Sequence, residues 1–121
     1  MGPEKRFEER IKTDIFAHGG YLIKYWGGGA YTKSGVPDLL ACVRGQFLGV
    51  EIKAEHGRPS TLQLVNLKRI DSAGGYAILL YPKDQEIFVE LLDALVRHKP
   101  MDAHVAYQAL REEWFAIYRR L

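Results

Sequence analysis

Two apolar runs on either side of a short break at Arg44-Gly45 constrain the fold of this chain more than any other feature of its sequence. The first run covers residues 39–43, and the second covers residues 47–53 and ends in charged side chains. Runs of this length around so short a break are typical of a β-hairpin. The period-two alternation of a strand then places Glu51 and Lys53 on one face, while Leu48, Val50 and Ile52 face the other way.

Acidic residues stand at the open end of this hairpin. Asp38 directly follows Pro37, so pairing of the two strands brings its side chain to the same end as Glu51. Two carboxylates a few ångströms apart repel one another unless a cation lies between them or one of them is protonated. With Lys53 beside them, they fit a metal site that acts on a phosphate group. A short pattern of this kind also occurs where the aspartate caps a turn and the other two charges lie on the surface of an edge strand.

A set of motifs surrounds the hairpin. It comprises Ser34-Gly35-Val36-Pro37-Asp38-Leu39-Leu40, the segment FLGVEIK at 47–53, Gly57-Arg58-Pro59-Ser60 and Gln63, preceded by an acidic amphipathic helix, Gly19-Gly20 and the segment 24–26. This combination resembles the virus-type replication-repair nuclease (VRR-NUC) family, a branch of the PD-(D/E)XK nuclease superfamily. The similarity extends from about residue 4 to about residue 81, and the remainder is interpreted from its pattern alone.

The pattern of elements and the resemblance agree on the fold class. Both indicate an α/β protein with a restriction-endonuclease-like α-β-β-β-α-β core, a mixed four-stranded sheet and appended C-terminal helices. The last strand is nearly all apolar, so we expect it to be central and buried on both faces. We expect helices at 4–17, 60–73, 84–97 and 102–120, strands at 21–26, 39–43, 47–53 and 76–81, an N-cap at Ser60, and a break at Lys99-Pro100.

Length and composition predict one domain, 1–121, with the nuclease core at about 4–81 and a helical extension at about 82–121. An apolar fraction of 47% and a charged fraction of 26% are typical of a soluble globular protein. Neither a membrane span nor a signal peptide is expected, so we predict an intracellular location. Cys42, the single cysteine, cannot form an internal disulfide, and within an apolar strand we expect it to be buried and inert.

The candidate metal is Mg²⁺, with Mn²⁺ able to substitute, because carboxylate and carbonyl oxygens are the ligands that Mg²⁺ prefers. We expect Asp38 and Glu51 to bind it, and the resemblance implies the backbone carbonyl of Ile52 as the third contact. Lys53 is expected to orient the attacking water or to stabilise charge in the transition state.

A carboxylate from the first helix completes the site in the related enzymes, and two residues compete for this role here. Glu4 and Glu8 are four residues apart and share a helical face. The spacing back from Gly19 favours Glu8 by analogy with related junction resolvases, whereas the opening Glu4-Lys5-x-Phe7 favours Glu4 within the virus-type branch. We expect Glu8 to be the ligand, and either acid could instead compensate the helix dipole at the surface.

Several further residues are candidates for contact with substrate. The resemblance implies that Gln63 reaches the active site. Arg58 and Ser60 could hold a phosphate, although capping explains Ser60 equally well. The glycine-rich loop 27–34 does not fit a nucleotide-binding loop, because Thr32 stands where a glycine is required, so no nucleotide cofactor is expected. The same loop offers Tyr31 and Lys33 as DNA contacts, and Lys24 belongs with them to a basic rim that could equally be a set of solvated surface charges.

The resemblance implies a metal-dependent, structure-selective DNA endonuclease of phage origin, similar to Holliday-junction resolvases in DNA repair. Two symmetric nicks in a four-way junction require two active sites, so we expect a homodimer. The apolar residues of the last helix, Val105, Leu110, Trp114, Ile117, Tyr118 and Leu121, are a candidate partner surface, unless they simply cover the chain's own sheet. The alternatives are a monomeric flap- or nick-processing nuclease and a non-catalytic DNA-binding module on the same fold.

Overall fold

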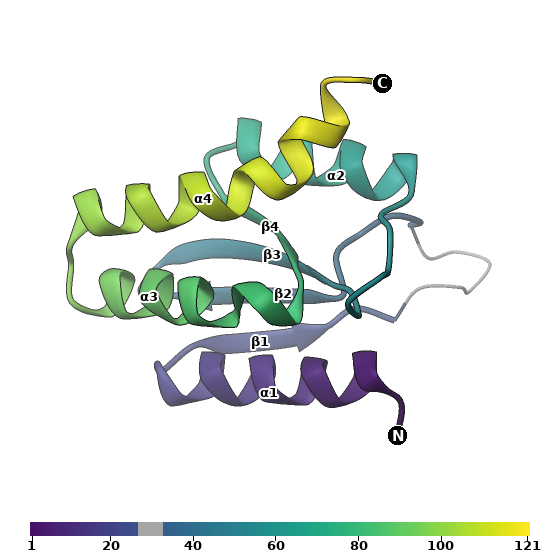
Figure 1. Ribbon diagram of the computed structural model, residues 1–121. Coiled ribbons are helices and arrows are strands. Elements are labelled where there is room, and N and C mark those ends of the chain that lie inside the picture. The colour runs from purple at the N-terminus through teal and green to yellow at the C-terminus, as the bar shows by residue number, and fades with distance from the viewer. Residues whose placement is uncertain (27–32) are drawn as a thin grey trace.

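Four strands and four α-helices make up the computed structural model, which describes residues 1–26 and 33–121 (Figure 1). The elements in chain order are α1 (Pro3–Ala17), β1 (Tyr21–Lys24), β2 (Leu39–Val43), β3 (Gln46–Ile52), α2 (Thr61–Ser72), β4 (Tyr76–Leu80), the short 3₁₀ helix η1 (Pro82–Asp84), α3 (Gln85–Val96) and α4 (Pro100–Tyr118). No helix in the described ranges is both long enough and apolar enough to cross a membrane.

The sheet has the order β1-β2-β3-β4. Its first two pairings are antiparallel and the third is parallel, which confirms the predicted mixed sheet and the crossover through α2. The β2–β3 hairpin turns over Arg44 and Gly45, both with positive φ, as a two-residue turn of this kind requires. At its other end the register pairs Leu39 with Val50, so that Asp38 comes beside Glu51.

Helices cover the two faces of the sheet unequally. One face packs against α1, α3 and the first half of α4, and the other packs against α2 and the end of α4, over β3 and β4 (Figure 1). None of the described helices covers the second face at β1 and β2, where Tyr21 is 70% exposed, and Phe47 beside them at the start of β3 is 46% exposed. Cys42 pairs with both of these residues and is exposed with them. The prediction of a buried thiol is therefore wrong, because strand periodicity does not reveal which face receives a helix.

Strand β4 is buried on both faces, as predicted, but it is not central, because it forms one edge of the sheet. Helix α4 crosses this edge and satisfies its backbone groups at Ala77. The hydroxyl of Tyr107 accepts a hydrogen bond from Ala77 N at 3.0 Å, and Nε1 of Trp114 donates to Ala77 O at 2.8 Å. Two aromatic side chains thus replace the missing neighbouring strand, which is one way of protecting an exposed edge.

Two helix starts show how local sequence sets the boundaries. Ser60 caps α2, and its hydroxyl accepts a hydrogen bond from Gln63 N while the Gln63 side chain accepts one from Ser60 N. Pro100, expected within a break, is instead the first residue of α4, a position where the missing N–H of proline costs nothing.

Candidate active site

The open end of the β2–β3 hairpin brings two carboxylates together. Asp38 follows the buried Pro37, and its Oδ2 accepts a hydrogen bond from Ile52 N at 2.9 Å. This bond fixes the aspartate against the end of β3, beside Glu51. Oδ1 of Asp38 lies 3.8 Å from Lys24 Nζ, and the Asp38 side chain is 28% exposed.

Glu51 is 3% exposed, and the two oxygens of its carboxylate have different surroundings. Oε2 accepts a hydrogen bond from Gln63 Nε2 at 3.1 Å and lies 3.7 Å from Lys53 Nζ. Oε1 is buried and finds no hydrogen-bond partner among the described residues. Burial raises the pKa of Glu51 to about 8, and the charge of Asp38 acts in the same direction. Such a group either holds a proton or requires a cation.

Gln63 reaches Glu51 because of the helix cap. The side-chain oxygen of Gln63 accepts a hydrogen bond from Ser60 N at the start of α2. This bond turns the side-chain NH₂ group of Gln63 toward the carboxylate of Glu51. A single side chain therefore ties the beginning of α2 to the candidate site. Tyr81, which the sequence did not single out, supports the same region, because its hydroxyl donates to Gly57 O at 2.7 Å in the connector before α2.

The two acids of α1 have different surroundings. Glu8 is 5% exposed, and its carboxylate lies 2.6 Å from Lys24 Nζ and 3.1 Å from Lys5 Nζ. Burial acts to raise the pKa of Glu8, but the hydrogen bonds from these two lysines outweigh it and lower the pKa below its ordinary value. Glu4 is exposed, and its negative charge contributes to the raised pKa of Glu51. Glu8 is thus held in a lysine cluster, whereas the charge of Glu4 acts on the Asp38–Glu51 pair.

The donor atoms suit a hard cation such as Mg²⁺. Asp38 Oδ1 and the partnerless Glu51 Oε1 are oxygen donors of two adjacent carboxylates, and the Ile52 carbonyl is the backbone oxygen between Glu51 and Lys53. Mg²⁺ is commonly held by one or two carboxylates and keeps several waters. Within residues 1–26 and 33–121, no group of three or more His, Cys, Asp or Glu side chains forms a metal-binding cluster. The residues present fit a cation held by two carboxylates and water rather than one enclosed by the protein.

Comparison with known proteins bears on the fold. No family model matches the chain, and no curated protein matches it. Among solved structures, the chain is similar to one described as "VRR_NUC domain", with a TM-score of 0.59 and 27% sequence identity, over 82% of this chain and 99% of that one. The chain has the VRR-NUC fold. It is therefore a nuclease-type domain.

The VRR-NUC fold brings some of the predicted site residues together and leaves others apart. Four predicted residues, Asp38, Glu51, Lys53 and Gln63, form one connected group through the contacts described above.

Lys24 was predicted to contact DNA, but its ammonium lies between Glu8 and Asp38, 3.8 Å from Asp38 Oδ1, and its side chain is only 18% exposed. Strand pairing could have indicated this position, because Lys24 pairs with Leu39, the residue after Asp38.

The remaining candidate DNA contacts lie on the surface of the domain. Arg58, Ser60 and Lys33 are exposed, and Ser60 serves as the helix cap described above. Tyr31 lies outside the described residues. A role for these side chains in binding DNA remains a prediction.

Proposed function

We propose that this protein is a metal-dependent, structure-selective DNA endonuclease that hydrolyses phosphodiester bonds in branched DNA, in the manner of a Holliday-junction resolvase. The observation that carries the proposal is the pair formed by Asp38 and Glu51, in which a buried carboxylate oxygen lacks any hydrogen-bond partner in the described chain. Leaving such a group unpaired costs stability, so its retention is explained by a ligand that is bound during function.

Each residue of the group has a distinct role in this proposal. Asp38, Glu51 and the Ile52 carbonyl hold Mg²⁺, for which Mn²⁺ substitutes, and the bound cation supplies charge neutralisation and an activated water. Lys53 keeps its ammonium near Glu51, where it stabilises negative charge that develops on the phosphate oxygens. Gln63 fixes the orientation of the Glu51 carboxylate through its hydrogen bond to Oε2.

The direct test is cleavage of labelled four-way junction, flap, single-stranded and linear duplex DNA in the presence of Mg²⁺, Mn²⁺ or EDTA. We expect cleavage of branched substrates that EDTA abolishes. Asp38→Asn and Glu51→Gln should abolish cleavage and weaken Mn²⁺ binding in calorimetric titration, because each leaves the cation with fewer ligands. The exposed Glu55 provides a matched control, since Glu55→Gln removes one carboxylate from the adjoining connector. Wild-type metal affinity and cleavage in both site variants would disprove the metal assignment.

The helix-borne acid needs a separate test, because the sequence favours Glu8 and the charges around Glu51 favour Glu4. Glu8→Gln should lower Mn²⁺ affinity if Glu8 is released from Lys24 to become a ligand. Glu4→Gln should do so if Glu4 turns toward the carboxylate pair. If Glu8 is only the partner of Lys24, Glu8→Gln lowers the melting temperature and leaves metal affinity unchanged.

A homodimer remains part of the proposal, because paired nicks in a four-way junction require two active sites and one chain holds one candidate site. The last helix gives it less support than its composition predicted, since Trp114 and Leu110 are buried within the chain's own core. Val105, Ile117 and Leu121 remain exposed on α4 and after it. Light scattering at micromolar concentration tests the dimer. A mass near 13.8 kDa that junction DNA does not change would favour a monomeric flap nuclease instead.

The non-catalytic alternative makes a different prediction. A DNA-binding module on the same fold would bind the labelled substrates with equal affinity in the wild-type protein and in Glu51→Gln, and would cleave none of them in Mg²⁺ or Mn²⁺.

A further inference from the structure

A second candidate binding site lies at the end of the sheet opposite Asp38 and Glu51. It is an open pocket of about 740 Å³ between the β2–β3 turn, the end of α2 and the connection from α3 to α4. Strand β3 separates the two sites by about 20 Å at the usual rise per residue. Figure 1 shows the α3–α4 connection at the end of the molecule away from the N-terminus. The polar side chains that line the pocket include Arg44, Asp71, His98, Lys99 and His104.

Two of these residues have backbone conformations that suit other residue types. Arg44 and His98 have φ of 52° and 54° and are the non-glycine residues with positive φ in the described chain. Arg44 opens the two-residue hairpin turn, where asparagine or glycine is favoured. His98 follows the last turn of α3, where Lys99 N bonds to Ala94 O at 2.9 Å and glycine is the usual residue. Both side chains are therefore present at a cost in backbone energy.

The two side chains converge although they are 54 residues apart. A guanidinium nitrogen of Arg44 lies 2.9 Å from Nε2 of His98. Both residues are exposed, and a contact between exposed side chains contributes little to stability. The contact therefore does not account for the cost of the two backbone conformations. Unfavourable backbone positions that gather at one place are a feature of functional sites.

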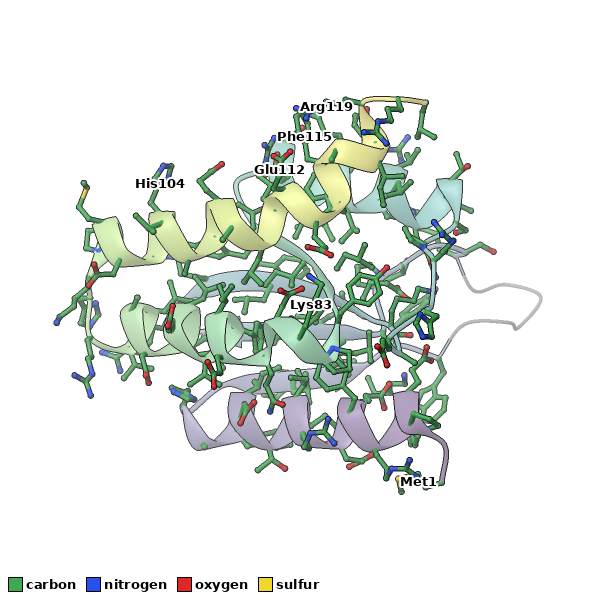
Figure 2. All side chains as sticks on the ribbon, viewed as in Figure 1. Met1, Lys83, His104, Glu112, Phe115 and Arg119 are labelled. Atoms are coloured by element: carbon green, nitrogen blue, oxygen red, sulfur yellow. The ribbon has the colours of Figure 1, made fainter. Side chains whose placement is uncertain are left out.

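The surroundings favour an anion. Lys99 and His104 add donors to the same pocket, and the first turn of the 19-residue helix α4 forms part of its wall, with its positive dipole end there (Figure 2 shows His104 near this end of α4). The acid in the lining, Asp71, is already compensated. Its two oxygens accept hydrogen bonds from Arg111 at 3.0 Å, and Tyr107 donates to it at 2.7 Å.

We propose that this pocket binds a phosphate group, with Arg44 as the principal ligand and His98, Lys99 and His104 as further donors. An arginine can offer two parallel N–H donors to phosphate oxygens. The phosphate belongs either to the backbone of bound DNA or to a small phosphorylated molecule. The site lies outside the candidate active site, and phosphate binding there does not depend on the proposed hydrolytic activity.

Titration with inorganic pyrophosphate, followed by amide chemical shifts at constant ionic strength, tests the proposal. The amide signals of Arg44, His98 and Lys99 should shift together and saturate. Arg44→Asn removes the guanidinium and places the favoured Asn-Gly pair in the turn, so the variant should melt no lower than the wild type and bind pyrophosphate about tenfold more weakly. Arg97→Asn is the matched control. It removes the same charge from the residue next to His98 in the sequence, and Arg97 lines a different pocket.

The outcomes separate the sources of the phosphate. Binding of a labelled duplex in EDTA that is weakened in Arg44→Asn, with a shallower salt dependence, assigns the pocket to a DNA phosphate. Unchanged duplex binding with lost pyrophosphate binding assigns it to a small phosphorylated molecule. The proposal is overturned if pyrophosphate leaves these amides unshifted in the wild type, or if Arg44→Asn and Arg97→Asn weaken its binding equally.

Discussion

Replacing Glu51 by glutamine should stabilise the metal-free protein even as it removes activity. Glu51 is 3% exposed, one of its carboxylate oxygens lacks a hydrogen-bond partner in the described chain, and its pKa is raised to about 8 by burial and by Asp38. Glutamine has nearly the same shape and carries no charge. Its amide also offers a donor that can face Asp38 instead of repelling it.

The magnitude follows from the proton that the folded protein must take up. The free energy of unfolding falls by about 1.4 kcal/mol for each pH unit above the ordinary carboxyl pKa of 4.5. This decrease ends at the folded pKa of about 8. At pH 7 this amounts to about 3 kcal/mol, and relaxation around the site reduces it to about 2 kcal/mol. For a domain of this size, the expected rise in melting temperature is about 5–10 °C.

The pH dependence gives the sign a separate check. Because the folded pKa lies above the unfolded value, the wild-type protein loses stability as pH rises from 4.5 toward 8. Glu51→Gln lacks this loss, so its advantage should be near zero at pH 4.5 and largest near pH 8.

Thermal melts followed by circular dichroism in EDTA at both pH values measure the difference. Glu55→Gln, the exposed control, should change stability by no more than about 0.5 kcal/mol. Adding Mg²⁺ should raise the melting temperature of the wild type by binding to the folded state, and should not raise that of Glu51→Gln. If Glu51→Gln melts at or below the wild-type temperature in EDTA near pH 8, the buried carboxylate is not a source of instability and the reasoning fails.

Three further predictions each concern one residue. Lys53→Ala should retain Mn²⁺ and DNA binding but lose turnover, and a normal turnover number with weakened DNA affinity would show that the lysine only contacts phosphate. Cys42 is exposed and should react rapidly with a thiol reagent in the native protein, whereas reaction only after unfolding would indicate that another surface covers it. Trp114→Phe should cost about 1–3 kcal/mol in urea unfolding, because Ala77 O loses its buried donor, and an unchanged midpoint would contradict this role of α4.

Much of the fold could be predicted from local chemistry. The two-residue turn set the hairpin, the capping residues set the start of α2, and the continuous apolar run identified β4 as buried on both faces. The error about the central position of β4 has a physical cause. Burial of a strand shows that something covers it, not whether the cover is a strand or, as here, the aromatic side chains Tyr107 and Trp114 of a distant helix.

The site was predictable to the extent that it depends on strand periodicity. Period-two alternation and hairpin pairing placed Asp38, Glu51 and Lys53 together, because both are properties of neighbouring residues. The surroundings of Glu8 could not be inferred in the same way. Its partner Lys24 is 16 residues away, and their 2.6 Å contact depends on how α1 packs against β1, which no local pattern encodes.

Both ends of the sheet hold residues that are energetically unfavourable at their positions. At one end, Glu51 is buried with a partnerless oxygen beside a second carboxylate. At the other, Arg44 and His98 occupy backbone positions that favour asparagine or glycine. Natural sequences violate local rules mainly where function requires it. The apolar core between the two ends stabilises the fold enough to offset these unfavourable residues. In this core α1, α3 and α4 pack against the sheet. Stabilising substitutions at Glu51 and Arg44 should therefore lower binding of cation and of phosphate, respectively, while substitutions that stabilise the core should leave both unchanged.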